Sequence, residues 1–210
     1  MGEEIALIFG SIPCAFWGFL EPLRGKARVF CADGGVLCAR AAGFVPDVYI
    51  GDGDSGGTPP AGAEAVLLPA EKDLTDLQAA YECARDRGYR RMVLTACTGG
   101  RQDHHLSNLL LLETAWREGV AVSVLDPWNE IFYTDGGRIE IPHGGFRYFS
   151  IVPADRTLQN VRITGAKYPL DAPVVRRGDS LTVSNETAGG PARIEIGVGA
   201  AWIIRSERLS

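Results

Sequence analysis

The sequence predicts an N-terminal α/β domain with a parallel sheet, followed by an all-β sandwich. In the first part, short β-rich segments alternate with longer segments of helical period, which is typical of parallel βαβ units. After residues 126–129 the helical period disappears, and short strand-like segments follow one another between Gly, Pro, Asn and Asp residues. That spacing is typical of antiparallel strands in a sandwich or barrel. A boundary near residues 126–130 therefore predicts domains at 1–128 and 129–210.

The strands predicted in the N-terminal domain are short apolar or β-branched segments, and the helices have apolar residues every three or four positions. Gly88 and Gly119 follow the second and third helices, where a left-handed C-cap residue is expected. In chain order, the predicted strands are Ile5–Phe9, Arg28–Cys31, Val48–Ile50, Ala65–Leu68, Arg91–Thr95 and Val120–Leu125. The predicted helices are Val36–Ala42, Thr75–Arg87 and Asp103–Glu118. In the third helix, the positions expected in the core are Leu106, Leu109, Leu110 and Trp116.

The C-terminal part is divided into short segments by residues that favour turns. Each segment has the length of a strand, and none shows a helical period. Asp135, beside Gly136 and Gly137, is expected in a hairpin turn. The predicted strands are Ile131–Tyr133, Arg138–Ile141, Arg147–Val152, Val161–Thr164, Asp179–Val183, Arg193–Val198 and Ala201–Arg205.

Composition excludes several classes of protein. The 210 residues are 46% hydrophobic and 22% charged, which is the balance of a globular protein and not of a disordered chain. The net charge of -5 leaves no basic excess for a general nucleic-acid binder. No uninterrupted apolar segment has the length of a transmembrane helix, so we expect no membrane association. The expected partner is therefore a small molecule.

The N-terminus and the cysteines favour a reducing compartment. Glu3 and Glu4 stand where a secretory signal would carry Lys or Arg. The five cysteines are an odd number without a C-x-x-C pair, which favours free thiols over a disulfide framework or a thiolate zinc site. We therefore expect a cytoplasmic protein.

Five carboxylates are expected at one rim of the parallel sheet. Asp33 follows the second predicted strand, Asp52 and Asp54 follow the third, and Asp73 and Asp76 open a helix. Open parallel sheets bind ligands at the carboxyl ends of their strands. Clustered carboxylates repel one another unless a cation lies between them, and oxygen ligands without His or Cys favour Mg²⁺ shared with substrate phosphates.

A structural role is the alternative for each of these residues taken singly. Asp73 or Thr75 would cap the helix, and Asp76 would complement its dipole. The other three carboxylates would be ordinary turn residues. Gathering all five at one rim favours the cation site over these separate roles.

A Gly-Gly turn precedes the third helix. Such a turn exposes backbone N–H groups, and the guanidinium of Arg101 can grip a phosphate through its planar fork. His104 and His105 are adjacent on the helix and cannot both face one ion, so His104 is expected as a ligand contact or a cap. No phosphate-loop, dinucleotide-binding, nucleophile-elbow or protein-kinase motif occurs. A nucleotide would therefore be bound by another route.

Four ordered motifs resemble those of the thiamine pyrophosphokinase family. They are Ala-Asp-Gly-Gly at 32–35, Gly-Asp-x-Asp-Ser at 51–55, Lys-Asp-x-Thr-Asp at 72–76 and Thr-Gly-Gly-Arg-x-Asp-His-x-x-x-Asn at 98–108. Residues 164–170 and 184–186 are similar to that family's sandwich-domain signatures. Gly53 is a departure, because an aromatic residue is more usual there, and it predicts a looser loop.

The resemblance implies transfer of the terminal diphosphate of ATP to the hydroxyethyl oxygen of thiamine, giving thiamine diphosphate and AMP. It also implies a homodimer whose sites lie between the nucleotide- and Mg²⁺-binding α/β domain of one subunit and the thiamine-binding sandwich of the other. The implied Mg²⁺ ligands are Asp52, Asp54 and Asp76, and the implied catalytic residues are these three with Asp73 and Arg101. The implied nucleotide contacts are Asp33, Lys72, Thr75, Arg101, Asp103 and His104. The implied thiamine contacts are Ser184, Asn185, Asp103 and His104.

Some alternatives stay open. Asp73 and Asp103 are both candidate acceptors for the hydroxyl proton. The Asp52-Gly53-Asp54 segment is similar to the D-x-D of Mg²⁺-dependent phosphohydrolases, although it follows the third strand and not the first. A pyrophosphokinase acting on a pterin alcohol would share the α/β half but not the sandwich. A non-catalytic nucleotide- or vitamin-binding module would not need the second acid pair, Asp73 and Asp76.

Overall fold

The computed structural model divides the chain into two compact units between Pro127 and Trp128. The structure describes residues 4–53, 59–69, 71 and 73–207. Asp54 and Lys72, both predicted site residues, lie outside the described residues. No helix in the described ranges is long and apolar enough to cross a membrane.

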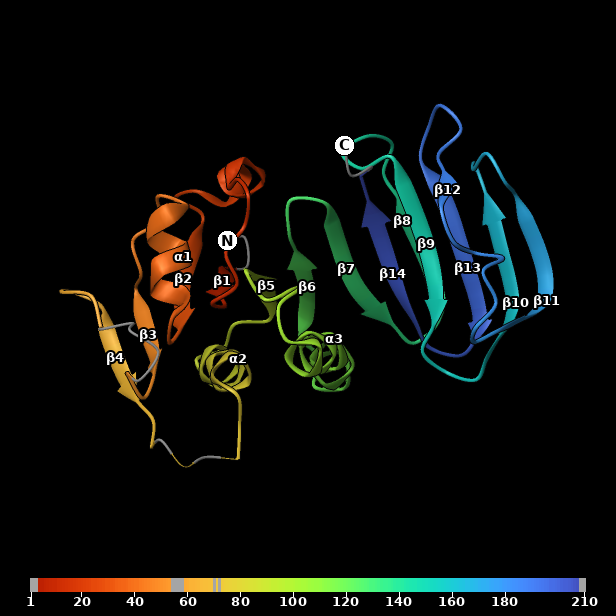
Figure 1. The fold of residues 1–210 in the computed structure, drawn as a ribbon. Coiled ribbons are helices and arrows are strands. Elements are labelled where there is room, and N and C mark those ends of the chain that lie inside the picture. The colour runs from red at the N-terminus through yellow and green to blue at the C-terminus, as the bar shows by residue number, and fades with distance from the viewer. Residues whose placement is uncertain (1–3, 54–58, 70, 72, 208–210) are drawn as a thin grey trace. The chain divides into compact units, whose positions relative to one another are not determined.

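A parallel sheet forms the centre of the N-terminal unit (Figure 1). Its strands are β1 (Ile5–Phe9), β2 (Ala27–Ala32), β3 (Val48–Gly51), β4 (Glu64–Leu67), β5 (Arg91–Thr95) and β6 (Ala121–Leu125). They lie in the order β6-β5-β1-β2-β3-β4, and each pairs in parallel with its neighbours. The predicted α/β fold is confirmed, and each predicted strand of this unit lies within one residue of its observed bounds.

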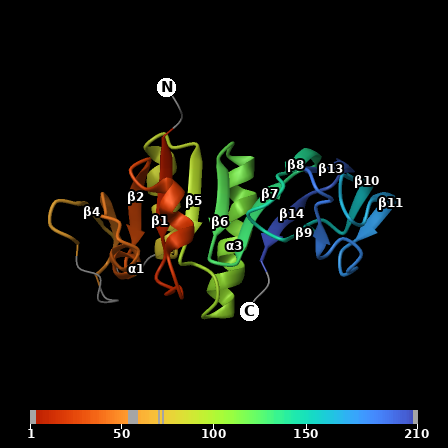
Figure 2. The same cartoon turned by 90° about the horizontal axis from the view of Figure 1, so that it is seen from above.

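Helices cover both faces of this sheet. They are α1 (Gly35–Ala41), α2 (Asp76–Asp86) and α3 (Gln102–Arg117). Figure 1 shows α1 on one face and both α2 and α3 on the other, and Figure 2 views the sheet from the side of α1, which packs on β1 and β2. A short 3-10 helix, Gly18–Leu23, was not predicted, and its Leu20 is fully buried.

The direction of the chain reverses once within the sheet. The chain runs outward from β1 through β2 and β3 to β4, and it then returns to β5 on the other side of β1. Right-handed crossovers on the two sides of such a reversal place their helices on opposite faces. The carboxyl ends of β1, β2 and β5 therefore surround a topological switch point, where open α/β sheets bind their ligands.

The predicted helix ends are confirmed, but the predicted core face of α3 is wrong. Gly88 and Gly119 have φ angles of +91° and +71°, as a left-handed C-cap requires. On α3, the exposed apolar side chains are Leu106, Leu110 and Trp116, whereas the buried residues are Asn108, Leu111, Leu112 and Ala115. A polar residue can occupy the buried face because the amide of Asn108 donates a 2.9 Å hydrogen bond to the carbonyl of Cys97.

Two antiparallel sheets form the C-terminal unit, as predicted for a sandwich. The strands are β7 (Asn129–Thr134), β8 (Gly137–Ile141), β9 (Tyr148–Pro153), β10 (Thr157–Thr164), β11 (Leu170–Arg176), β12 (Asn185–Glu186), β13 (Ala192–Val198) and β14 (Ala201–Ser206). One sheet has the order β12-β9-β14-β7 and the other the order β11-β10-β13-β8. A single apolar cluster takes residues from both sheets, among them Phe149, Ile203, Val161 and Ile194.

Three predictions for this unit need correction. Residues 179–183 form turns and not a strand. They are hydrogen-bonded to β9 through Thr182, whose carbonyl accepts from the Ile151 N–H and whose hydroxyl donates to the Ile151 carbonyl. Strands β11 and β12 were not predicted, because Pro173 and the flanking glycines interrupt the pattern by which a strand is recognised in the sequence. The turn at Asp135 is not a hairpin, because it joins two strands of different sheets.

Backbone packing at the start of α1 depends on Gly35. A Cβ atom there would lie 2.2 Å from the carbonyl oxygen of Phe9 at the end of β1. We expect Gly35→Ala to lower the free energy of unfolding by about 1–3 kcal/mol, the usual range for overpacking, as measured by urea denaturation.

Gly18→Ala is the control for that substitution. A Cβ at Gly18 has no neighbour within 4 Å, and Gly18 has no left-handed φ angle. Its effect on stability should be small. Equal losses of stability in the two variants would contradict the role assigned to Gly35.

Candidate active site

A cavity of about 260 Å³ lies at the switch point of the parallel sheet. Its walls come from the segments that follow β1, β2 and β5 and from the starts of α2 and α3. The lining includes Gly10, Ser11, Asp33, Thr75, Asp76, Arg101, His104 and Asn108. The topology therefore brings five predicted site residues to one cavity: Asp33, Thr75, Asp76, Arg101 and His104.

Asp33 is buried at the end of β2, and its side chain is only 2% exposed. Its backbone has a left-handed φ of +41°, which is uncommon for a residue other than glycine. Its N–H donates to the carbonyl of Ile50 at 2.7 Å, and its Oδ1 accepts from the hydroxyl of Tyr49 at 2.7 Å. Its Oδ2 is buried and has no hydrogen-bond partner among the described residues. A buried acceptor of this kind is costly unless a ligand uses it.

The buried phenol of Tyr49 contacts the carboxylate of Asp33. Burial, the hydrogen bond to Asp33 and the charges of Asp33, Asp52 and Asp76 together raise the pKa of Tyr49 well above its usual value. The phenol therefore stays protonated and acts as a donor. Asp52 directly follows β3, which pairs with β2, so it lies at the same edge of the sheet as Asp33.

The first turn of α2 places Thr75 and Asp76. The Thr75 hydroxyl accepts from the Gln78 N–H at 3.2 Å, so Thr75 is the N-cap, as the structural alternative predicts. Asp76 lies in the first turn, where the helix dipole favours a negative charge, and its Oδ1 is buried. Asp73 precedes the cap and is exposed.

The loop between β5 and α3 is held by hydrogen bonds at three points. The Gly99 N–H donates to Nδ1 of His105 at 2.8 Å, and the Thr98 hydroxyl donates to Asp126 at 2.9 Å. The buried Asn108 amide donates to the Cys97 carbonyl at 2.9 Å. No role was predicted for His105, although its place six residues after Gly99, in the first turn of α3, was a usable signal.

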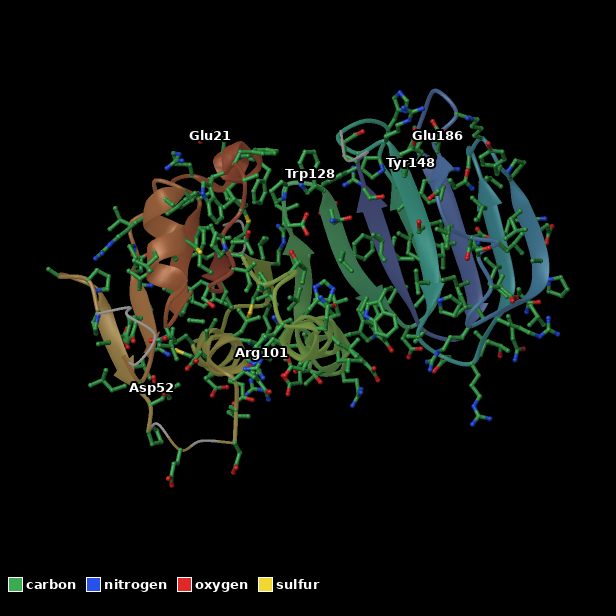
Figure 3. All side chains as sticks on the ribbon, in the orientation of Figure 1. Glu21, Asp52, Arg101, Trp128, Tyr148 and Glu186 are labelled. Carbon is green, nitrogen blue, oxygen red and sulfur yellow. The ribbon has the colours of Figure 1, made fainter. Side chains whose placement is uncertain are left out.

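Arg101 and Asp103 form an ion pair at the start of α3, with a 2.6 Å contact. This hydrogen bond and one from the His104 N–H lower the pKa of the Asp103 carboxyl. Asp103 is therefore a weak proton acceptor. The side chain of Arg101 is 74% exposed, so its guanidinium is accessible to a ligand. Figure 3 labels Arg101 at this helix and Asp52 at the end of β3.

The thiol in the cavity wall is not an activated nucleophile. Cys97 is 4% exposed, and burial raises its pKa to about 12. Burial likewise raises the pKa of Cys14 to about 11 and that of Cys31 to about 12. All five cysteines are free, as the sequence predicts.

Ser184 and Asn185 lie in the C-terminal unit, where Asn185 has a structural role. Its Oδ1 accepts from the N–H groups of Tyr168 at 3.1 Å and Glu186 at 2.9 Å, and its Nδ2 donates to the Tyr168 carbonyl at 2.7 Å. Asn185 thereby fixes the loop that carries Tyr168. Ser184 is exposed, has a left-handed φ of +61°, and donates its N–H to the Ser150 hydroxyl. Figure 3 labels Glu186 on β12 beside Tyr148 on β9.

The acidic rim contains oxygen ligands of the kind that bind a hard cation. Among the described residues, no three His, Cys, Asp or Glu side chains form a ready metal cluster. The set predicted from the sequence includes Asp54, which lies outside the described residues. Asp52, Asp76 and the buried Oδ2 of Asp33 are the described carboxylate oxygens of this rim.

Two family models match the chain. Residues 21–124 match the model described as "Thiamin pyrophosphokinase, catalytic domain". Residues 138–200 match the model described as "Thiamin pyrophosphokinase, vitamin B1 binding domain". The two matches follow the order of the α/β and antiparallel units.

Similar proteins carry the same name. A curated "Thiamine pyrophosphokinase" of Bacillus subtilis is 29% identical over 181 residues, which cover 83% of this chain and 85% of the relative. A crystal structure of thiamine pyrophosphokinase from Bacillus subtilis has a TM-score of 0.86 at 27% identity and covers 98% of this chain and 99% of its own. The corresponding structure from Geobacillus thermodenitrificans has a TM-score of 0.84 at 28% identity, with the same two coverages.

Fold, cavity and matches together define a kinase-class transferase with an α/β catalytic part. The chain belongs to the thiamine pyrophosphokinase family.

Proposed function

We propose that the chain transfers the diphosphate of ATP to the hydroxyl of thiamine, with the cavity of the N-terminal unit as the nucleotide site. The observation that carries this proposal is the position of Asp33, Asp76 and Arg101 around one cavity at the switch point of the sheet. An acidic rim and an accessible guanidinium are what phosphoryl transfer requires, because its catalysis is mostly positioning and charge stabilisation.

In this proposal, the residues that line the cavity bind the nucleotide. We propose that Arg101, which lines the cavity, holds phosphate oxygens through the edge of its guanidinium that does not face Asp103. The Gly99 N–H of the Gly-Gly turn is already donated to His105 and is not counted as a phosphate donor. His104 lines the same cavity and contacts nucleotide or substrate. Asp103 orients Arg101 through their ion pair. Lys72, outside the described residues, is proposed as a further phosphate contact.

Mg²⁺ fits the donor set of the rim. Asp52, Asp76 and Asp54 are the proposed ligands, and the buried Oδ2 of Asp33 is an acceptor that a hydrated cation can satisfy. Bound there, Mg²⁺ supplies charge neutralisation at the phosphoryl oxygens. Asp73 is the better candidate for the hydroxyl proton, because Arg101 keeps the pKa of Asp103 low.

Thiamine is assigned to the C-terminal unit, and the family resemblance is the support for a homodimer with shared sites. The loop held by Asn185 presents Tyr168, which is 58% exposed. An aromatic face suits the cationic thiazolium ring, although the Lys167 ammonium already lies 5.5 Å from the ring centroid of Tyr168. We propose Ser184 as a direct contact and Asn185 as the residue that positions this loop. The free thiols support a cytoplasmic location.

The reaction is tested by incubating the protein with ATP, Mg²⁺ and thiamine. We expect AMP and thiamine diphosphate in equal amounts, and Asp76→Asn should lower kcat by roughly 100-fold or more, the scale for losing one charge-stabilising group. The substitution keeps the shape of the side chain, so circular dichroism should be unchanged.

Asp135→Asn is the matched control, because Asp135 is an exposed turn residue of the other unit. It should retain wild-type turnover. Release of phosphate without AMP would indicate a phosphohydrolase, and binding without turnover would indicate a non-catalytic module. Either result would reject the proposed reaction.

Arg101→Lys tests the phosphate contact. An ammonium keeps the charge but cannot meet two oxygens, so kcat/KM for ATP should fall by about tenfold, or about 1.4 kcal/mol. Arg117→Lys is the control, because Arg117 is an exposed arginine of the same helix paired with Glu113. Unchanged kinetics for Arg101→Lys would make that residue structural.

Mixed dimers test the shared site. Asp76→Asn and Asn185→Ala homodimers should each be nearly inactive, whereas a heterodimer combines wild-type halves in one of its two sites. About half of the wild-type activity per heterodimer is therefore expected. Ser184→Gly, which suits the left-handed backbone there, replaces Asn185→Ala if that variant loses its fold.

A site contained in one chain would leave both sites of every heterodimer defective. No recovery of activity after confirmed subunit exchange would thus reject the shared site. The proposed reaction would be unaffected by that result.

A further inference from the structure

Tyr49 is a buried residue at the acidic rim to which the sequence motifs assign no role. It lies on β3, three residues before Asp52, and its side chain is fully buried. Its hydroxyl donates to Oδ1 of Asp33 at 2.7 Å. This hydrogen bond joins the segment that follows β2 to the strand that leads into the second acidic motif.

Gly51 makes this contact possible. A Cβ atom at Gly51 would lie 2.8 Å from the Tyr49 hydroxyl, 2.8 Å from the Cβ of Asp33 and 2.9 Å from its Oδ1. Any side chain there would therefore displace the phenol from the carboxylate. The glycine that opens the Gly-Asp-x-Asp-Ser motif is explained by the space that the Tyr49–Asp33 pair occupies.

Asp33 needs a fixed orientation. Asp33 lines the cavity, and its backbone is left-handed, with φ of +41°. With Oδ1 occupied by Tyr49, Oδ2 is buried and has no hydrogen-bond partner within the described part of the chain. Oδ2 is thus the oxygen that a ligand in the cavity can use. A phenol has one proton to donate, and that of Tyr49 is donated to Asp33.

We infer that Tyr49 is a positioning residue, which holds Asp33 so that Oδ2 meets the hydrated Mg²⁺–phosphate group of the nucleotide in the cavity. This inference rests on the proposed function. Residues that orient a metal-binding carboxylate through a hydrogen bond commonly change metal affinity by roughly 10–100-fold when they are removed.

Tyr49→Phe tests the inference, with Tyr81→Phe as the matched control. Tyr81 is also a buried tyrosine, and its hydroxyl donates to a carboxylate, that of Glu118, at 2.6 Å. Glu118 does not line the cavity, whereas Asp33, the partner of Tyr49, does. Both variants lose one phenol–carboxylate hydrogen bond, so both should lose stability to urea by a similar amount. Only Tyr49→Phe should change the response to Mg²⁺.

Two readouts measure that response. The first is the thermal unfolding midpoint as a function of Mg²⁺ concentration, with a non-hydrolysable ATP analogue present. The second is the Mg²⁺ concentration that gives half-maximal turnover. In both, Tyr49→Phe should require roughly 10–100-fold more Mg²⁺ than the wild type and Tyr81→Phe, while KM for thiamine stays unchanged.

The Asp33→Asn variant tests whether Tyr49 acts through Asp33. Asparagine tolerates the left-handed backbone and still accepts from Tyr49, but it lacks the charge. In this background, Tyr49→Phe should not raise the half-saturating Mg²⁺ concentration for analogue binding any further. An equal further increase would overturn the inference.

Two other outcomes are decisive. A wild-type half-saturating Mg²⁺ concentration in Tyr49→Phe would make Tyr49 a structural residue and overturn the inference while AMP production stands. A wild-type protein that forms no AMP and is not stabilised by Mg²⁺ and the analogue would overturn the proposed function itself, and this inference with it.

Discussion

The acidic rim depends on how closely the backbone segments approach one another at the carboxyl ends of β1, β2 and β3. A Cβ at Gly10 would lie 2.5 Å from the Ala96 carbonyl oxygen, and one at Gly35 would lie 2.2 Å from that of Phe9. At Gly51 the obstacle is the Tyr49–Asp33 pair. Because these positions carry no side chain, the ends of the strands converge tightly enough to place carboxylates from separate motifs at one rim. A side chain at any of these glycines would push the strand ends apart. The acidic motifs would then move away from one another, although no acidic residue had been changed.

Charge is concentrated at this rim, and the surrounding structure makes that concentration tolerable. Asp33 is stabilised by a neutral donor, Tyr49, and Asp76 by the amino end of α2. Arg101 is paired with Asp103 beside the cavity, so a cation is available there without neutralising the acidic cluster. In the proposed diphosphate transfer, these carboxylates would hold the metal and the guanidinium would contact the phosphates.

The C-terminal unit carries polar loops on a sandwich with an apolar core. Its two sheets share one apolar cluster, so the loops are free to differ without loss of the core. Asn185 satisfies three backbone groups with one buried amide, which fixes the Tyr168 loop more firmly than turn residues alone would. Asn185, which the family resemblance implied as a thiamine contact, therefore supports the Tyr168 loop.

Periodicity and turn residues in the sequence were enough to determine the two-part fold and the bounds of the N-terminal strands, because both depend on local patterns of burial. The acidic motifs also predicted the rim, since the carboxyl ends of parallel strands share one edge. Tertiary structure alone decided the hydrogen bonds of Tyr49 and Asn108. Each acts through a partner that is distant in sequence, Tyr49 on Asp33 and Asn108 on Cys97, and no local pattern encodes such a contact. The buried face of α3 also depends on tertiary structure, because the amide of Asn108 can be buried only where it bonds the Cys97 carbonyl of another segment.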